Sequence, residues 1–159
     1  MSPIARIIVA AAAMSAAVIS TAAAQNYSLQ PNYGAVNLTG GFTPDPYSVN
    51  LQSGGSVNVG QTIGGSCRGF VADAPDVRLN YSPGSLPLII SVASGSDTTL
   101  VVNAPDGRWY CDDDSGVNGL NPMVRFNSPM SGQYDIWVGT YGNATLQAAQ
   151  LQISELYSQ

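Results

Sequence analysis

The sequence predicts a single all-β domain, built as an antiparallel sandwich or barrel and preceded by an export signal. Three observations support this prediction. Short runs of β-branched and aromatic residues recur at regular spacing between clusters of Gly, Pro, Asn, Asp and Ser. Strong helix formers are scarce after residue 24, where the chain has one Glu and no Lys. The length of 159 residues suits one domain.

Residues 1–24 are predicted to be a cleavable, helical signal peptide. Arg6 supplies a positive start, an apolar run covers residues 7–19, and the small residues Ala22 to Ala24 precede Gln25. This order, ending in an A-x-A pattern, is typical of export signals, and an uncleaved membrane anchor is the alternative. We therefore expect a chain that is secreted, held at the cell surface or kept in the periplasm, with no membrane span after processing.

Residues 25–46 are predicted to form an N-terminal arm, with an ordinary edge strand as an equally open alternative, and residues 47–159 the β-domain. Residues 47–51 alternate cleanly, and the glycines that follow predict a hairpin to a strand at 56–59. Pro87 cannot donate a ladder hydrogen bond, so the N-terminal part of the strand around it is expected to be an edge or to lie outside the ladder. Further strands are expected at 69–72, 77–81, 86–92, 98–103, 108–111, 123–127, 133–139 and 148–155.

Cys67 and Cys111 are the only cysteines of the chain. Because both follow the predicted signal, we expect a disulfide, as is usual in an oxidising compartment. Their separation of 44 residues corresponds to about 4 kcal/mol of stabilisation in the chain-entropy model. A zinc site and a thioredoxin-type redox site are not expected, because the chain has no His, no second Cys pair and no C-x-x-C.

Four stretches carry a family resemblance: LIISV from residue 88, DTTLVVNAPDG from residue 97, DDD from residue 112 and MVRFNSPMSGQYDIWV from residue 123. Together they resemble the bacterial pre-peptidase C-terminal domain over residues 48–154, although Thr99 stands where that family usually has an Asp. The resemblance implies a jelly-roll-like β-sandwich of the kind appended to secreted peptidases. It also implies non-catalytic work in secretion, folding or binding of substrate or matrix, in some cases with calcium.

The acidic run Asp112, Asp113 and Asp114 is the first candidate site. Adjacent carboxylates repel each other, and calcium takes six to eight oxygen ligands in flexible loops. Asp97 and Asp106, at the ends of the preceding strand, are expected to reach the same rim. Calcium is therefore the candidate cofactor. The alternative is a solvated acidic loop in which the Asp side chains cap turns.

The second candidate site is an aromatic surface next to a carboxylate. Strand alternation in 133–138 places Asp135 and Trp137 on the face away from the core, and Trp109 is close in sequence to Cys111. Exposed aromatic rings suit a sugar or a protein partner. The alternative is that Trp109 packs against the disulfide and Trp137 against a second sheet or the arm.

Composition excludes several classes of function. The chain carries 10 acidic and 5 basic residues, all of the latter Arg, which argues against nucleic-acid binding. Without His or Lys, the usual bases of Ser and Cys hydrolases are missing, and there is no G-x-S-x-G elbow.

We therefore predict an exported acidic protein without enzymatic activity, which serves in binding or surface assembly and is assisted by calcium. Its partner is expected to be an extracellular protein or polysaccharide, or a second copy of the chain. One alternative is a structural subunit of an extracellular polymer. Another is a secreted hydrolase of atypical mechanism, with a carboxylate pair drawn from Asp97, Asp112 and Asp135.

Overall fold

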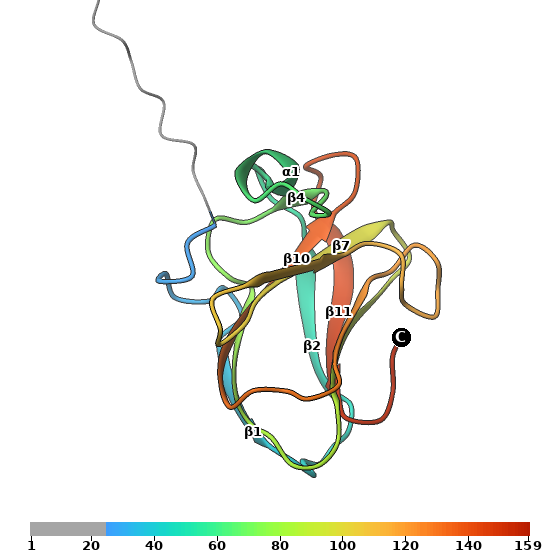
Figure 1. Cartoon of the computed structure of the whole chain (residues 1–159). Coiled ribbons are helices and arrows are strands. Elements are labelled where there is room, and N and C mark those ends of the chain that lie inside the picture. The colour runs from blue at the N-terminus through green and yellow to red at the C-terminus, as the bar shows by residue number, and fades with distance from the viewer. Residues whose placement is uncertain (1–24) are drawn as a thin grey trace, which may run out of the picture.

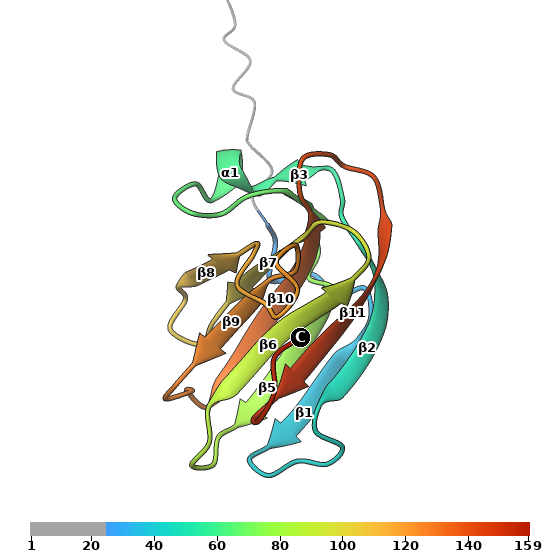
Figure 2. The same ribbon diagram turned by 90° about the vertical axis from the view of Figure 1, so that its right-hand side faces the viewer.

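The computed structural model describes residues 25–159, and the signal peptide predicted for residues 1–24 lies outside them. Two sheets face each other (Figures 1 and 2). Sheet A contains β1 (Ala35–Thr39), β5 (Val77–Ser82), β10 (Gly132–Thr140), β7 (Thr98–Asn103) and β8 (Trp109–Asp112), with the short strands β3 (Val57–Asn58) and β4 (Phe70–Val71) at one end of β10. Sheet B has the order β2 (Tyr47–Ser53), β11 (Gln147–Ser154), β6 (Leu88–Ser94) and β9 (Met123–Phe126). A single turn of helix, α1 (Val59–Thr62), follows β3.

The predicted all-β sandwich is confirmed, and every predicted strand range overlaps an observed strand. Strand β6 begins at Leu88, directly after Pro87, as expected from the missing proline donor. Among the described strands, β1 and β5 form the one parallel pair, and the other pairs are antiparallel. None of the described residues forms a helix that is long and apolar enough to cross a membrane.

Part of the predicted N-terminal arm is a strand of the sandwich. Strand β1 pairs with β5 from Ala35 opposite Arg78 to Thr39 opposite Ser82, so it forms an edge of sheet A. This is the alternative that the sequence left open. The arm is therefore the shorter segment 25–34, and the β-domain begins before residue 47.

The predicted hairpin between residues 47–51 and 56–59 is wrong. Strand β2 pairs with β11 in sheet B, whereas β3 pairs with β4 in sheet A. The two glycines between them carry the chain from one sheet to the other: the N–H of Gly54 donates to the carbonyl of Val138 at 2.9 Å. A side chain at Gly55 would overlap the main chain of Val71, so the crossing needs glycine at this position.

The main core fills the space between the sheets. As predicted from the alternation of β10, its residues Tyr134, Ile136 and Val138 face inwards. The strand period of two places alternate residues of both sheets in this layer. Its other buried aliphatic and aromatic members include Leu51, Val77, Leu79, Tyr81, Leu88, Ile90, Val92, Leu100, Val102, Val124, Phe126, Leu151 and Ile153.

A second, smaller core lies on the outer face of sheet A. The segment 57–71 folds over that face and packs against Val101 and Trp137. Cys67 of this segment forms the predicted disulfide with Cys111 of β8, with 5.0 Å between the Cα atoms. The disulfide therefore fastens the covering segment to the sheet, and β7 is buried along its whole length.

Candidate binding site

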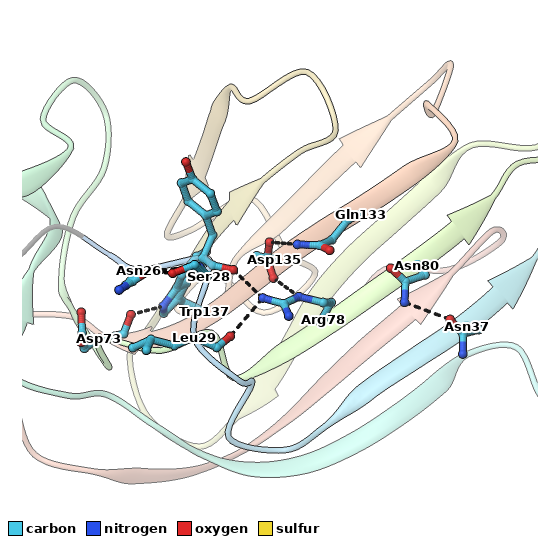
Figure 3. Close-up of polar contacts among 11 residues, drawn as sticks. Asn26, Ser28, Leu29, Asn37, Asp73, Arg78, Asn80, Gln133, Asp135 and Trp137 are labelled. Carbon is cyan, nitrogen blue, oxygen red and sulfur yellow. Dashed lines mark hydrogen bonds and ion pairs between the residues drawn. The ribbon is translucent and has the colours of Figure 1, made fainter.

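The N-terminal arm is fastened to the outer face of sheet A by an ion pair. Arg78 of β5 and Asp135 of β10 stand opposite each other in the strand register, and the guanidinium Nε lies 2.7 Å from the Asp135 Oδ1. The same guanidinium donates to the main-chain carbonyls of Tyr27 and Leu29 (Figure 3). One arginine thus neutralises a nearly buried carboxylate and holds the arm across two strands.

Next to this ion pair lies a pocket of about 650 Å³. The arm, the start of β10, the start of β8 and the turn between β7 and β8 surround it. Tyr27, whose side chain is 54% exposed, and Trp109 are the aromatic residues among its walls. The full lining is Tyr27, Asn103, Ala104, Pro105, Gly107, Trp109, Ser131, Gly132, Gln133 and Asp135.

The carboxylate in this pocket is already paired on both oxygens. Arg78 occupies Oδ1 of Asp135, and the side-chain amide of Gln133 donates to Oδ2 at 2.7 Å (Figure 3). The lining therefore offers aromatic faces, amide groups and a compensated charge. Such a surface suits an uncharged ligand with an apolar face and hydroxyl groups.

Two of the three residues predicted for an aromatic surface line this pocket, and the third does not. Trp109 and Asp135 belong to the lining, although Asp135 itself is only 2% exposed. Trp137 is fully buried beneath segment 57–71, and its indole Nε1 donates to the carbonyl of Asp73 at 3.3 Å. The prediction of Trp137 as a surface residue is therefore wrong, because a distant segment covers its strand face.

Trp109 both lines the pocket, as predicted for a surface residue, and packs beside the disulfide, as in the alternative. Its ring lies 5.4 Å from that of Trp137, centroid to centroid, and packs against the second core beside Cys111. The pocket also uses Tyr27, which the sequence did not single out. Its position depends on Arg78, which lies 51 residues along the chain, and no local pattern reports such a contact.

In the predicted calcium loop, the side chain of Asp112 caps main-chain N–H groups of its own loop. Its carboxylate accepts hydrogen bonds from the N–H of Ser115 at 2.9 Å, from the Ser115 hydroxyl at 2.6 Å and from the N–H of Met123 at 2.9 Å. This is the turn-capping alternative. Asp112 therefore orders the loop that leads from β8 to β9.

Asp106 does not reach the acidic loop. It lies in the turn between β7 and β8, at the opposite end of this strand pair from Asp112. There its carboxylate accepts from the N–H of Arg108 at 3.0 Å and from the hydroxyl of Tyr110 at 3.2 Å. The prediction that it shares the rim with Asp97 is wrong, because the two residues flank β7 at opposite ends.

Burial and neighbouring carboxylates act on Asp97 and Asp113. Burial, followed by the charges of Asp114 and Asp113, raises the pKa of Asp97, and burial with Asp114 and Asp112 raises that of Asp113. The Oδ1 atom of Asp97 is buried without a hydrogen-bond partner. In residues 25–159, however, no three or more acidic, Cys or His side chains come together closely enough to hold a metal ion. Calcium binding remains a prediction, and Asp97, Asp113 and Asp114 are the carboxylates that remain candidates for it.

Comparisons with known proteins found similar chains among solved structures. No protein-family model and no curated protein matches the chain. Among solved structures, the pre-peptidase C-terminal domain of a collagenase from Bacillus anthracis aligns with 76% of this chain and 94% of its own, at 15% identity and a TM-score of 0.44. A periplasmic inhibitor of g-type lysozyme from Aeromonas hydrophila, PliG, aligns with 76% of this chain and 96% of its own, at 14% identity and a TM-score of 0.38.

Proposed function

We propose that this protein is an exported, non-catalytic binding module that holds a neutral sugar unit of an extracellular polysaccharide. The observation that supports this most strongly is the pocket on sheet A, where Tyr27 and Trp109 flank a carboxylate that is already paired. The Cys67–Cys111 disulfide supports an oxidising compartment outside the cytoplasm.

The chemistry of the pocket favours sugars over charged ligands. A sugar ring has an apolar face that stacks on an aromatic ring, and hydroxyls that both donate to and accept from side-chain amides such as that of Gln133. A cationic ligand would have to displace Arg78 from Asp135, and an anionic ligand would face the carboxylate directly. A neutral polyhydroxylated ligand needs neither change.

The placement of the carboxylates supports a non-catalytic role. Hydrolysis of a glycosidic bond needs two carboxyl groups facing each other across a cleft. Asp135 stands opposite Asn103 of β7 and is neutralised by Arg78. Asp112 stands opposite Leu100, further along β7, and its carboxylate accepts hydrogen bonds within its own turn. No second carboxylate lines the pocket.

Binding to a panel of immobilised bacterial and plant polysaccharides, followed by calorimetric titration with oligosaccharides of any polymer retained, tests the proposal. We expect Trp109→Ala and Tyr27→Ala each to weaken binding at least tenfold. Tyr141→Ala is the matched control, because Tyr141 is exposed but follows the far end of β10. Equal affinity of all four proteins, or retention of no polysaccharide, would contradict the assignment.

We also propose that calcium binds beside Asp97, where the charges of Asp113 and Asp114 act on this carboxylate. The unpartnered, buried Oδ1 of Asp97 supports this, since a cation would satisfy it and would offset the burial and the charges of Asp114 and Asp113, which together raise the pKa of Asp97. With so few side-chain ligands, main-chain carbonyls and water would complete the coordination sphere. Millimolar CaCl₂ should raise the Tm of the wild type more than equal MgCl₂ does, and should not do so for Asp97→Asn. Equal shifts with both salts would mean general screening.

A further inference from the structure

Gln25 carries a buried polar group that the fold leaves without a partner. The residue is 4% exposed. Its side-chain carbonyl Oε1 lies 3.0 Å from the Thr62 hydroxyl, whose single proton it shares with the carbonyl of Asn58 at 3.2 Å, whereas its amide Nε2 is buried with no hydrogen-bond partner. Such orphaned donors are rare in folded proteins, and each needs an explanation. The amide nitrogen of Gln25 therefore loses its hydrogen bonds to water on folding and gains none in return.

Gln25 is also the residue that follows the predicted signal-peptide cleavage site, after Ala22-Ala23-Ala24. Cleavage there would make it the N-terminal residue and convert its main-chain nitrogen into an α-ammonium group. At a residue so little exposed, this charge would be poorly hydrated. The residue would then bury two nitrogen groups that favour water, the ammonium and the side-chain amide.

We infer that the exported chain begins at Gln25 and that this residue is cyclised to pyroglutamate. This modification rests on the export step of the proposed function. In the reaction, the deprotonated α-amine attacks the side-chain carbonyl carbon Cδ and forms the lactam C–N bond. The bond from Cδ to Nε2 breaks, and Nε2 leaves as ammonia with a proton from the amine. No oxidant, reductant or other co-reactant is needed.

The lactam matches the contacts that the structure shows. The former Oε1 becomes the lactam oxygen and keeps the Thr62 hydrogen bond, while the group that leaves is the orphaned Nε2. The α-ammonium charge disappears in the same step. Beyond the ring, the N–H of Asn26 donates to the carbonyl of Asp73 at 2.9 Å and fixes the start of the arm.

The ring would also join the arm to the segment that covers the second core. Thr62 ends helix α1, and Cys67 in the same segment is disulfide-bonded to Cys111 of β8. The neutral end of the chain would thus pack on a segment that is itself covalently fixed to sheet A. We therefore expect cyclisation to stabilise the folded protein as well as to block its N-terminus.

The first test is intact-mass and N-terminal peptide analysis of the full-length chain after export by a bacterial host, with Gln25→Ala as the control. We expect a chain that starts at residue 25, is lighter than its sequence by one ammonia, and loses its first residue to pyroglutamyl aminopeptidase after unfolding; the variant should show no such loss of mass. A start at Gln25 with a free amine would overturn cyclisation but leave export intact. A start at another residue near the predicted cleavage site would overturn the cleavage site and the cyclisation but leave export intact, whereas a chain that keeps residues 1–24 would count against export as well.

The second test measures the effect on stability. A precursor cleaved in vitro directly before Gln25 gives the uncyclised chain, which can be melted before and after conversion by glutaminyl cyclase. We expect conversion to raise the Tm by ~2–4 °C, and Thr62→Ala to abolish the rise because the lactam oxygen loses its donor. An unchanged or lowered Tm of the wild type would overturn the structural role assigned to the ring.

Discussion

The carboxylate of Asp76 accepts a hydrogen bond from the main-chain N–H of Val138 at 2.8 Å. At this point β10 has left β5, with which it pairs up to Ile136, and has not yet reached β4, with which it pairs at Thr140. The carboxylate of Asp76 thus accepts a main-chain hydrogen bond that neither β5 nor β4 can accept at this position. A further hydrogen bond from the side chain of Asn32 connects Asp76 to the N-terminal arm.

This arrangement predicts that stability falls as the pH rises from about 4 to 7. Burial raises the pKa of Asp76 from 3.8 to about 7, against the opposing effect of the hydrogen bonds from Val138 and Asn32. In that window the folded state binds a proton that the unfolded chain has released, so the contribution of Asp76 is most favourable below pH 4 and is lost as the pH rises through the folded pKa. The full loss is of order 4 kcal/mol, at 1.36 kcal/mol per pKa unit.

Urea unfolding of wild type and Asp76→Asn across this pH range checks the prediction. The amide keeps an acceptor for the Val138 N–H but does not titrate, so most of the slope should vanish and the variant should equal or exceed the wild type at pH 8. Asp76→Ala is expected to lose about 1–3 kcal/mol at every pH, because it leaves that N–H buried and unpaired. Parallel pH profiles of wild type and Asp76→Asn would assign the dependence to other groups.

Removing the ion pair at Arg78 should free the N-terminal arm. Arg78→Ala leaves Asp135 without its cation and releases the carbonyls of Tyr27 and Leu29. We expect a loss of about 3 kcal/mol in unfolding free energy, typical of a broken buried pair. Hydrogen–deuterium exchange should show faster exchange in residues 26–34.

Arg78→Lys provides the matched control for that experiment. Lysine keeps the charge next to Asp135, but it lacks the planar fork that lets one side chain bind a carboxylate and two carbonyls at once. It should therefore retain much of the stability while still loosening the arm. Unchanged exchange in residues 26–34 of both variants would show that other contacts hold the arm in place.

The sequence predicted the strands well because side-chain alternation is a local property. In β10 it correctly assigned Tyr134 to the core and Trp137 to the opposite face. It left open whether Trp137 is exposed or packed against a second sheet or the arm, and it did not indicate the segment that in fact covers this face. The cover comes from residues 57–71, which are far away in sequence, and short-range periodicity carries no information about such contacts.

Turn residues similarly indicated where the chain bends, but not which strand the following segment pairs with. Gly54 and Gly55 predicted a turn, and the chain does bend there, but it crosses to the other sheet instead of forming a hairpin. Likewise, Asp112 was recognised as important within its loop. Whether it caps a turn or binds an ion depended on the position of Met123, whose N–H it accepts.

The disulfide should contribute substantially to stability. Replacing both Cys67 and Cys111 by Ala removes a crosslink that closes a loop of 44 residues. The chain-entropy model gives a loss of about 4 kcal/mol, and removing native disulfides from small domains typically costs about 2–5 kcal/mol. Denaturant unfolding of the double variant measures this loss directly. A stability equal to that of the wild type would mean that the second core alone holds segment 57–71 in place.

The open edge of sheet B predicts self-association. Strand β2 pairs only with β11 among the described strands, so its other side is an open edge of the sheet (Figure 2), where the N–H of Gln52 donates to the hydroxyl of Tyr33 at 2.8 Å. Protein edges of this kind usually carry a charge, a proline or a bulge that prevents strand addition. The sequence YSVNLQS of β2 contains neither charge nor proline. We propose that a second copy adds a strand here, which is the route to the extracellular polymer considered from the sequence.

Light scattering of the mature protein over a range of concentrations tests this edge. We expect the apparent mass to rise with concentration for the wild type and to stay at that of a monomer for Ser48→Lys, because an exposed lysine on β2 places unpaired charges side by side in the joined sheet. Val117→Lys, on an exposed loop residue away from β2, is the matched control and should associate like the wild type. A wild type that stays monomeric at every concentration, or a Ser48→Lys variant that associates normally, would rule out strand addition at β2.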